Sequence, residues 1–232
     1  MSGFRSGVTR VVVAGLLMGL GAGISAEAQA PRHGRRESTA VRKARIQRII
    51  EETYGFRNEL SGGGGYLRFR AGELIKKNNE VTFYLNDTYF LNPKLGIVAD
   101  VHGGYGNAKI GNTIYNIPNP QISEYTFTGG PSYRFYAKQR YAMSVFGTGG
   151  IARGNFSGGS KAIPSTLIGI WQDGWRPAFT AGVNFDYNFY PNLAGRVTPT
   201  YIGTTFTGPQ GGTIQNNLGI NFGVVYRFGR QR

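Results

Sequence analysis

The fold is indicated most clearly by the stretch Asn217–Phe228, which reads NLGINFGVVYRF. From Leu218 onward every second residue is large and apolar, whereas the residues between them are mostly small or polar. Alternation with a period of two is typical of a β-strand with one apolar face. The run is also close to the roughly 9–11 residues that a tilted strand needs to cross the apolar core of a membrane.

Seven segments upstream show the same alternation. In Phe179–Phe189 and in Leu95–His102, apolar residues alternate with glycine, polar and acidic residues. The eight segments begin near Gly63, Glu80, Leu95, Ile122, Tyr141, Pro177, Leu193 and Asn217. Eight short alternating segments separated by turns predict an all-β protein.

The first two segments are less regular than the others. The first is rich in glycine, so only Leu67–Arg70 (LRFR) sets its orientation, and we place its two arginines inside. In the second, continuing the outward pattern of Val81–Leu85 places Asp87 outward as well. We therefore expect an irregular or bulged end to the second segment.

The connections between segments alternate in length, which predicts the topology. The short ones are Asn92–Lys94, Ala137–Arg140 and Tyr190–Asn192. The longer ones are Glu73–Asn79, Gly106–Gln121, Ala152–Arg176 and Gly203–Asn216. This alternation is typical of an antiparallel up-and-down barrel with short periplasmic turns and longer outer loops.

Charge placement distinguishes a membrane barrel from a soluble one. A soluble ligand-holding barrel has bulky apolar residues inside and many charges outside, whereas a membrane barrel has a polar interior and an apolar outer face. These segments are sparsely charged, and their charges share a face with Gly, Ser, Thr and Asn, which favours the membrane barrel. The charges that we assign to the lumen are Arg68, Arg70, Asp100, Glu124, Arg134, Asp186, Arg196 and Arg227.

We expect these lumenal charges to form a salt-bridged plug. An eight-stranded barrel has an interior just wide enough for side chains to fill, and buried charges need partners. The arginines would pair with Asp100, Glu124 and Asp186, and His102 would be hydrogen-bonded in the same interior. Two alternatives are an acid–base pair of Asp100 with Glu124, and a catalytic His102 that meets a serine or Glu124 from the neighbouring strand.

The N-terminal region has two parts. Residues 1–28 read as a secretory signal peptide, because two arginines precede the apolar core Val11–Ile24, and Ala26–Ala28 fits a cleavage site. The alternative is an uncleaved anchor helix. Residues 29–58 form a basic periplasmic leader that can be helical from about Ala40 to Thr53. It either lies on anionic lipid or a partner, or is a solvated leader, which we favour.

Composition excludes several classes of function. The chain has 232 residues, a formal net charge of +14 and no cysteine, so it has neither disulfides nor thiolate metal sites. Eight basic residues against three Glu lie between Pro31 and Asn58, and no basic block with interleaved aromatics follows, so we expect no nucleic-acid binding. The glycine runs Gly62–Gly65 and Gly147–Gly150 lack the lysine and helix of a phosphate loop. We predict no cofactor, no metal and no catalytic residue.

The C-terminal run resembles the assembly signal of outer-membrane barrels. That signal has a polar residue, glycine two positions later, and aromatics at the last and third-last positions. The matching residues are Asn221, Gly223, Tyr226 and Phe228. The resemblance implies recognition by the barrel-assembly machinery.

The region from Glu59 to Gly229 resembles the small outer-membrane β-barrel family, which includes OmpA-type membrane domains and related "porin family" proteins. The resemblance is carried by Gly65–Phe69, Leu95–Asp100, Tyr125–Phe135 and the run from Gln215 onward. It implies an eight-stranded transmembrane barrel at 59–232 in the outer membrane, but no single activity.

Three functions therefore remain open. The first is a structural or surface-interaction barrel that is embedded in outer-membrane lipid and binds an extracellular ligand at its outer loops. Tyr115, Trp171 and Trp175 are candidate exposed aromatics there, unless the two tryptophans pack within the loop or at the membrane interface. The second is a narrow pore for ions or small solutes. The third, which we favour least, is a lipid-modifying enzyme.

Overall fold

The computed structural model describes residues 38–73, 75–110, 117, 119–158, 160, 163–209, 211–212 and 214–230. The predicted signal peptide, the first part of the leader and Tyr115 lie outside these residues.

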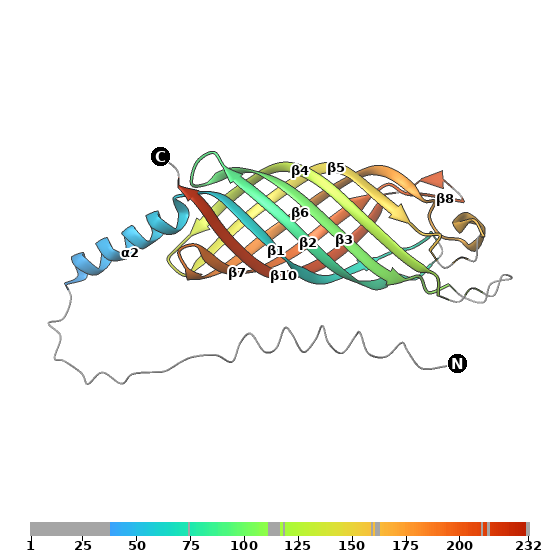
Figure 1. The fold of residues 1–232 in the computed structure, drawn as a ribbon, viewed down its shortest axis with the longest axis horizontal. Helices are drawn as coiled ribbons and strands as arrows, with labels where there is room; N and C mark the ends of the chain where they lie inside the picture. The colour runs from blue at the N-terminus through green and yellow to red at the C-terminus, as the bar shows by residue number, and fades with distance from the viewer. Residues whose placement is uncertain are drawn as a thin grey trace, which may run out of the picture. The chain divides into compact units, whose positions relative to one another are not determined.

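Eight antiparallel strands close into a barrel, as Figure 1 shows. The strands are β1 (Phe56–Phe69), β2 (Asn78–Phe90), β3 (Leu95–Asn107), β4 (Gln121–Ala137), β5 (Tyr141–Asn155), β6 (Gly174–Tyr190), β7 (Leu193–Thr204) and β10 (Gln215–Arg230). Each strand pairs with the next in the chain, and β10 pairs with β1. The predicted up-and-down topology is confirmed. Seven strands begin within three residues of the predicted position, whereas β1 begins at Phe56 rather than near Gly63.

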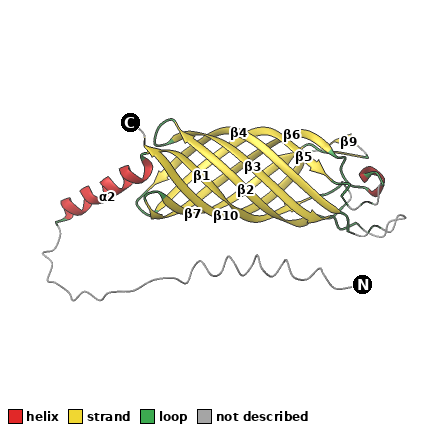
Figure 2. Cartoon of the chain, in the orientation of Figure 1, coloured by secondary structure: helices red, strands yellow, loops and turns green. Residues whose placement is uncertain are grey.

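The two ends of the barrel differ, as Figure 2 shows. At one end, which we call the short-turn end, the connections are residues 91–94, 138–140 and 191–192. At the other, which we call the loop end, they are residues 70–77, 108–120, 156–173 and 205–214. The loop end also carries the 3₁₀ helix η2 (Ser165–Ile168) and a hairpin of β8 (Thr207–Gly208) and β9 (Gly211–Gly212).

The outer face of the barrel is apolar. On β10 the six outward residues are Leu218, Ile220, Phe222, Val224, Tyr226 and Phe228, and they are 40–62 % exposed. The inward positions of the same strand include Asn217, Asn221 and Arg227, which are at most 2 % exposed. Polar residues thus face the lumen, as predicted.

The predicted irregularity in the second strand is wrong. β2 alternates between buried and exposed residues over its whole length, with Asp87 outward. Its ladders with β1 and β3 continue past Asp87 without a shift. Shifts in register occur instead in β4 between Arg134 and Tyr136, and in β6 between Asn188 and Tyr190.

Glycines bring the first and last strands close together. Gly63 pairs with Gly223 across β1 and β10. A Cβ atom on Gly63 would lie 2.0 Å from the carbonyl oxygen of Phe222, and one on Gly223 would lie 2.4 Å from the carbonyl oxygen of Gly62. Only glycine fits such a close approach of backbones.

The helix α2 (Thr39–Tyr54) precedes β1 and lies close to the helical span predicted for the basic segment. Most of its side chains are exposed, but Thr53 and Tyr54 are buried. A Cβ on Gly55 would lie 2.7 Å from the carbonyl oxygen of Glu51, which explains a glycine directly after the helix. None of the helices in the described ranges has both the length and the apolar character needed to cross a membrane.

Candidate functional site: a layered lumen

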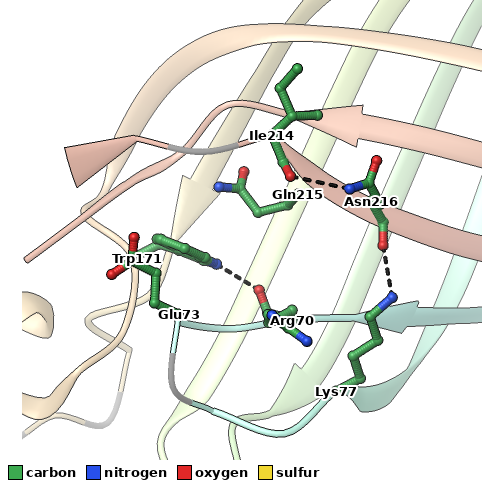
Figure 3. A pocket seen from close by; sticks show the side chains of 7 residues that line it. All are labelled: Arg70, Glu73, Lys77, Trp171, Ile214, Gln215 and Asn216. Carbon is green, nitrogen blue, oxygen red and sulfur yellow. Dashed lines mark hydrogen bonds between the residues drawn. The ribbon is translucent and has the colours of Figure 1, made fainter. Parts of the chain in front are cut away.

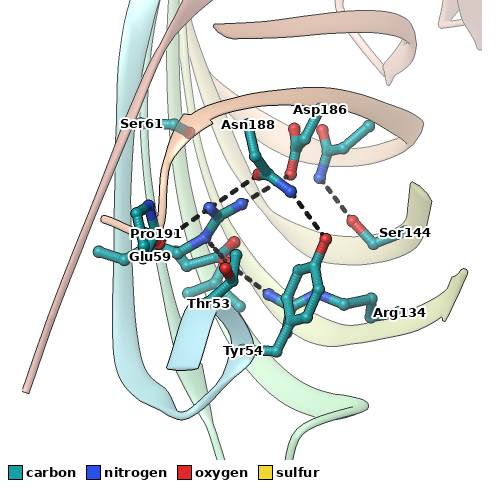
Figure 4. A network of polar contacts seen from close by, with 12 residues as sticks. Thr53, Tyr54, Glu59, Ser61, Arg134, Ser144, Asp186, Asn188 and Pro191 are labelled. Carbon is teal, nitrogen blue, oxygen red and sulfur yellow. Dashed lines mark hydrogen bonds and ion pairs between the residues drawn. The ribbon is translucent and has the colours of Figure 1, made fainter. Parts of the chain in front are cut away.

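An ion-pair network fills the short-turn end of the lumen (Figure 4). Glu59 Oε1 accepts hydrogen bonds from Arg227 Nε at 2.6 Å and from Arg134 Nη2, and Glu59 Oε2 accepts one from Arg196 Nη2 at 3.1 Å. Arg196 also binds both carboxylate oxygens of Asp186, at 2.7 and 2.9 Å. These five side chains come from β1, β4, β6, β7 and β10 and are at most 3 % exposed. The network therefore links five of the eight strands.

Tyr54, the last residue of α2, packs against this network at the short-turn end. Its hydroxyl donates to the carbonyl oxygen of Lys138 at 2.7 Å and accepts from Asn188 Nδ2 at 2.8 Å. Its ring lies 4.8 Å from the guanidinium carbon of Arg134 and 5.6 Å from that of Arg227. Burial raises the pKa of the Tyr54 hydroxyl above its ordinary value. The last residue of α2 is thus part of the lumenal plug.

The middle of the lumen is organised around His102. Its Nδ1 lies 2.7 Å from Asp100 Oδ2, and its Nε2 lies 3.2 Å from Asn221 Nδ2. Nδ1 therefore carries the proton that Asp100 accepts, and Nε2 accepts from Asn221. Thr82 Oγ1 donates to Asn221 Oδ1 at 2.9 Å. Both ring nitrogens are occupied, and the described contacts of His102 include no serine or threonine hydroxyl that it could activate.

Nearer the loop end, Glu80 and Glu124 face the lumen. They are 1 % and 3 % exposed. The predicted pairing of Glu124 with an arginine is wrong, because neither glutamate forms a hydrogen bond or an ion pair with any described residue. The alternative pairing of Asp100 with Glu124 also fails, because Asp100 lies opposite Thr128 and Glu124 lies opposite Gly104.

An apolar cluster, which we call the cap, closes the loop end. It consists of Leu67, Phe69, Ala71, Ala108, Ile117, Ile122, Ala152, Phe156, Ile168, Ile170, Trp171, Ala178, Ile202 and Phe206. The ring of Phe156 is stacked with that of Phe69, with centroids 6.0 Å apart, and it meets the ring of Phe206 edge-on, with centroids 5.0 Å apart. Inward strand residues and loop residues thus pack together at the barrel mouth.

The two tryptophans have different environments. Trp171 is 1 % exposed, and its Nε1 donates to the carbonyl oxygen of Arg70 at 2.6 Å, as Figure 3 shows. Its predicted exposure is wrong, and it packs within the loops instead. Trp175 is 49 % exposed on the outer face of β6, with its ring 6.1 Å from Phe127. A cavity of about 160 Å³ beside Trp171 is lined partly by Arg70, Lys77 and Gln215.

Seven of the nine residues assigned to the lumenal charge network are buried. They are Asp100, His102, Glu124, Arg134, Asp186, Arg196 and Arg227. Arg68 and Arg70 are exposed instead, because the alternate residues Leu67 and Phe69 point inward into the cap. The sequence reading missed Glu59, which it placed at the barrel boundary. It also missed Glu80, whose inward position follows from the outward Val81.

Comparison with known proteins identifies the fold. No protein-family model and no curated protein sequence matches this chain. Neisserial surface protein A (NspA) matches with a TM-score of 0.51, 11 % identity, and coverage of 74 % of this chain and 97 % of that one. OprG from Pseudomonas aeruginosa matches with a TM-score of 0.49, 13 % identity, and coverage of 76 % of this chain and 99 % of that one. Ail of Yersinia pestis matches with a TM-score of 0.46, 19 % identity, and coverage of 74 % of this chain and 97 % of that one.

The match to NspA and the apolar outer face define the class of the molecule. It is a small, closed, eight-stranded antiparallel β-barrel of the kind found in outer membranes.

Proposed function

We propose that this protein is an integral outer-membrane barrel with a sealed lumen, whose role is structural or depends on its loop-end surface. The observation that carries the proposal is the filling of the lumen at both ends. Ion pairs and Tyr54 close the short-turn end, and the cap closes the loop end. Because described side chains fill the lumen at both ends, we infer that the barrel does not conduct water or solute.

The outer face supports a position within the membrane. Its exposed apolar band ends in aromatic groups at both rims. Near the short turns the ring centroids of Tyr141 and Tyr187 lie 5.3 Å apart, and near the loops those of Tyr105 and Tyr125 lie 5.8 Å apart. Aromatic girdles on both sides of an apolar band are typical of outer-membrane barrels. We assign the short-turn end to the periplasm and the loop end to the exterior.

Biogenesis follows from the same proposal. Residues 1–28 direct secretion and are cleaved, the residues between them and the start of β1 at Phe56 remain as a periplasmic leader, and the barrel-assembly machinery recognises the end of β10. There, Tyr226 and Phe228 are 50 % and 41 % exposed on the outer face, and their rings stack at 6.1 Å. An outward aromatic pair is accessible to an assembly factor before the last strand closes the barrel.

The loop-end surface is basic, which favours an anionic extracellular partner. A cavity of about 620 Å³ is lined by Arg68, Lys77 and Lys109 together with neutral residues. The variant Arg68→Gln/Lys109→Gln should bind less to an anionic polysaccharide such as dextran sulfate. Lys94→Gln/Lys138→Gln, at the other end, should bind as the unmodified chain does. Equal binding by both variants would exclude this surface as the ligand site.

Planar-bilayer conductance of the full chain tests the sealed lumen. Insertion is first verified by the difference in gel mobility between unboiled and boiled samples. We expect a folded barrel that gives no discrete current steps at any salt concentration. Reproducible steps that scale with salt would instead establish the narrow pore, with the arginine-rich short-turn end as its selectivity region.

A catalytic role is not part of this proposal. A lipid-modifying barrel needs a nucleophile within reach of a base, and the imidazole of His102 is occupied by Asp100 and Asn221. Lipid A from cells that overproduce the protein should therefore be chemically unchanged. A modified lipid A that reverts with His102→Ala would contradict the proposal.

A further inference from the structure

The helix α2 joins the barrel at the short-turn end with no linker. It ends at Tyr54 and β1 begins at Phe56, so Gly55 is the one residue between them. The Tyr54 hydroxyl lies 2.7 Å from the carbonyl oxygen of Lys138 and 3.3 Å from that of Tyr141. Tyr141 belongs to the aromatic group that we place at the periplasmic rim of the apolar band. The C-terminal end of α2 is therefore held at the level of that rim.

The segments at this end carry a large excess of positive charge. In α2, the three short turns and residues 55–57 and 229–230, nine basic and two acidic residues are exposed. The two acidic residues are Glu51 and Glu52, and Glu52 lies 3.8 Å from Arg230. Four of the nine basic residues lie in α2 itself, and they are Arg42, Lys43, Arg45 and Arg48. A surface of this charge attracts an anionic partner.

Three isoleucines mark one side of α2. Ile46, Ile49 and Ile50 have the spacing i, i+3, i+4, so they are neighbours on the helix surface, and each is partly exposed. Glu51 and Glu52 follow Ile49 and Ile50 by two positions each. At 3.6 residues per turn, a separation of two positions places them on nearly the opposite side. The side that carries the three isoleucines, which we call the isoleucine side, is therefore apolar and directed away from both acidic residues.

Basic residues extend the isoleucine side toward the N-terminus. Arg42 and Lys43 precede Ile46 by four and three positions, so they lie on the same side one turn earlier, and both are exposed. At the other end, Thr53 follows Ile49 by four positions and is 1 % exposed, so the isoleucine side is covered where α2 meets the barrel. Apolar residues together with Lys and Arg are typical of a helix that lies at the surface of an anionic membrane.

We propose that α2 lies along the membrane surface at the short-turn end and binds anionic phospholipid headgroups through its isoleucine side, Arg42 and Lys43. This inference rests on the proposed function, which places the short-turn rim at a membrane surface. Arg42 is 12 residues before Tyr54, roughly 18 Å at the rise of a helix. Because charges are screened within about 8 Å at physiological salt, Arg42 meets the headgroups only when the helix runs along the surface. The sequence favoured a solvated leader because it did not show that Tyr54 fixes α2 at this level.

A groove beside the short turn 138–140 has the same chemistry. Its volume is about 410 Å³, and its lining includes the cation of Arg140 and the aromatic side chains of Tyr187 and Phe189. Both aromatic residues are exposed on the outer face of β6. A cation above outward aromatic rings suits a lipid whose phosphate lies at the surface and whose chains lie in the apolar band. The barrel rim and α2 are therefore both suited to anionic phospholipid.

The test uses protein purified from the membranes of expressing cells and reconstituted into vesicles of phosphatidylcholine, with or without phosphatidylglycerol. Both leaflets of a vesicle have the same composition, so the direction of insertion does not matter. The chain has no cysteine, so Ile46→Cys provides a single site for a fluorophore whose emission depends on its surroundings. Gln47→Cys labels the adjacent position, which points away from the isoleucine side.

We expect the label at Ile46 to shift to shorter wavelength when phosphatidylglycerol is present, and to shift back in high salt. The label at Gln47 should shift less. Addition of Arg42→Gln/Lys43→Gln should abolish the shift. Arg68→Gln/Lys109→Gln, which removes the same charge at the loop end, should retain it.

The opposite results overturn the proposal. The same emission in both kinds of vesicle, or a shift that survives Arg42→Gln/Lys43→Gln, would show that α2 does not bind anionic lipid through these residues. Cosedimentation with purified peptidoglycan in place of a lipid response would assign the helix to the cell wall instead. Insertion is verified first by gel mobility. A barrel that does not insert contradicts the proposed function, whereas an inserted barrel without the lipid response contradicts this inference alone.

Discussion

Glu59 and Arg227 lie directly opposite each other in the ladder that joins the first strand to the last, and Arg227 Nε donates to Glu59 Oε1 at 2.6 Å. Residues 168 positions apart thus form a charged contact where the barrel closes. Arg134 and Arg196 bind the same carboxylate from β4 and β7. Glu59 is therefore the hub of the short-turn network.

Glu59→Gln should strongly destabilise the barrel. The variant leaves three buried arginines with Asp186 as the one remaining carboxylate of the network, and removal of one partner from a buried ion pair costs about 3–5 kcal/mol. Urea unfolding in micelles, followed by gel mobility, measures the change. Glu52→Gln is the control, because Glu52 is 47 % exposed and its contact with Arg230 is 3.8 Å long. Similar midpoints for both variants would show that Glu59 is not the hub.

Tyr54→Phe should loosen the short-turn end without removing the ring beneath the arginines. The hydroxyl bonds to the carbonyl oxygen of Lys138 and to the buried side chain of Asn188 are lost, which costs about 1–2 kcal/mol. The unfolding midpoint should fall accordingly, whereas Tyr136→Phe, on the exposed outer face, should leave it unchanged. An unaltered midpoint for Tyr54→Phe would mean that α2 does not contribute to the plug.

The contribution of Tyr54 to the stability of the folded barrel should depend on pH in the alkaline range. Burial raises its pKa in the folded state above the ordinary value of 10.0, so the neutral hydroxyl is favoured there. Its stabilisation is therefore fully present below the unfolded pKa, and it is lost as the pH rises through the higher folded pKa. The difference in unfolding midpoint between the unmodified chain and Tyr54→Phe should shrink above that range. A difference that stays constant would contradict the assigned burial.

The sequence was sufficient to predict the strand number, the topology and most of the lumenal charges. Those features follow from alternation and loop length, and both patterns are strong in β10 and β6. It failed at Leu67–Arg70 because the rule of polar inside and apolar outside holds only within the membrane band. At the loop end, Ile122, Ala178 and Ile202 also face inward, since loops fold over the mouth and make it apolar.

The partners of the lumenal charges were the second feature that the sequence could not predict. Alternation assigns a residue to the inner face but gives no register between strands, so it could not show that Glu124 is near Glu80 and far from every arginine. Glu59 was missed because the glycine run that follows it hides the start of β1. In both cases the missing information was the position along the barrel axis.

The corrected orientation of β1 predicts opposite effects for adjacent residues. Phe69 is fully buried in the cap, so Phe69→Ala should cost about 3–5 kcal/mol. Arg68→Ala removes an exposed side chain and should change the unfolding midpoint little. If Arg68 faced the lumen, the order of the two effects would be reversed. The pair of unfolding curves therefore tests the orientation directly.

Single-tryptophan variants should report the two environments at the loop end. In Trp175→Phe the remaining Trp171 lies in the cap, so its emission should be at short wavelength and resistant to iodide in water and to brominated lipid. In Trp171→Phe the remaining Trp175 lies on the outer face near Phe127, with Arg153 5.5 Å from its ring. An outward ring at the edge of the apolar band should be quenched by lipid brominated near the headgroup. Lipid quenching of Trp171, or its absence for Trp175, would contradict both the cap and the proposed position of the membrane.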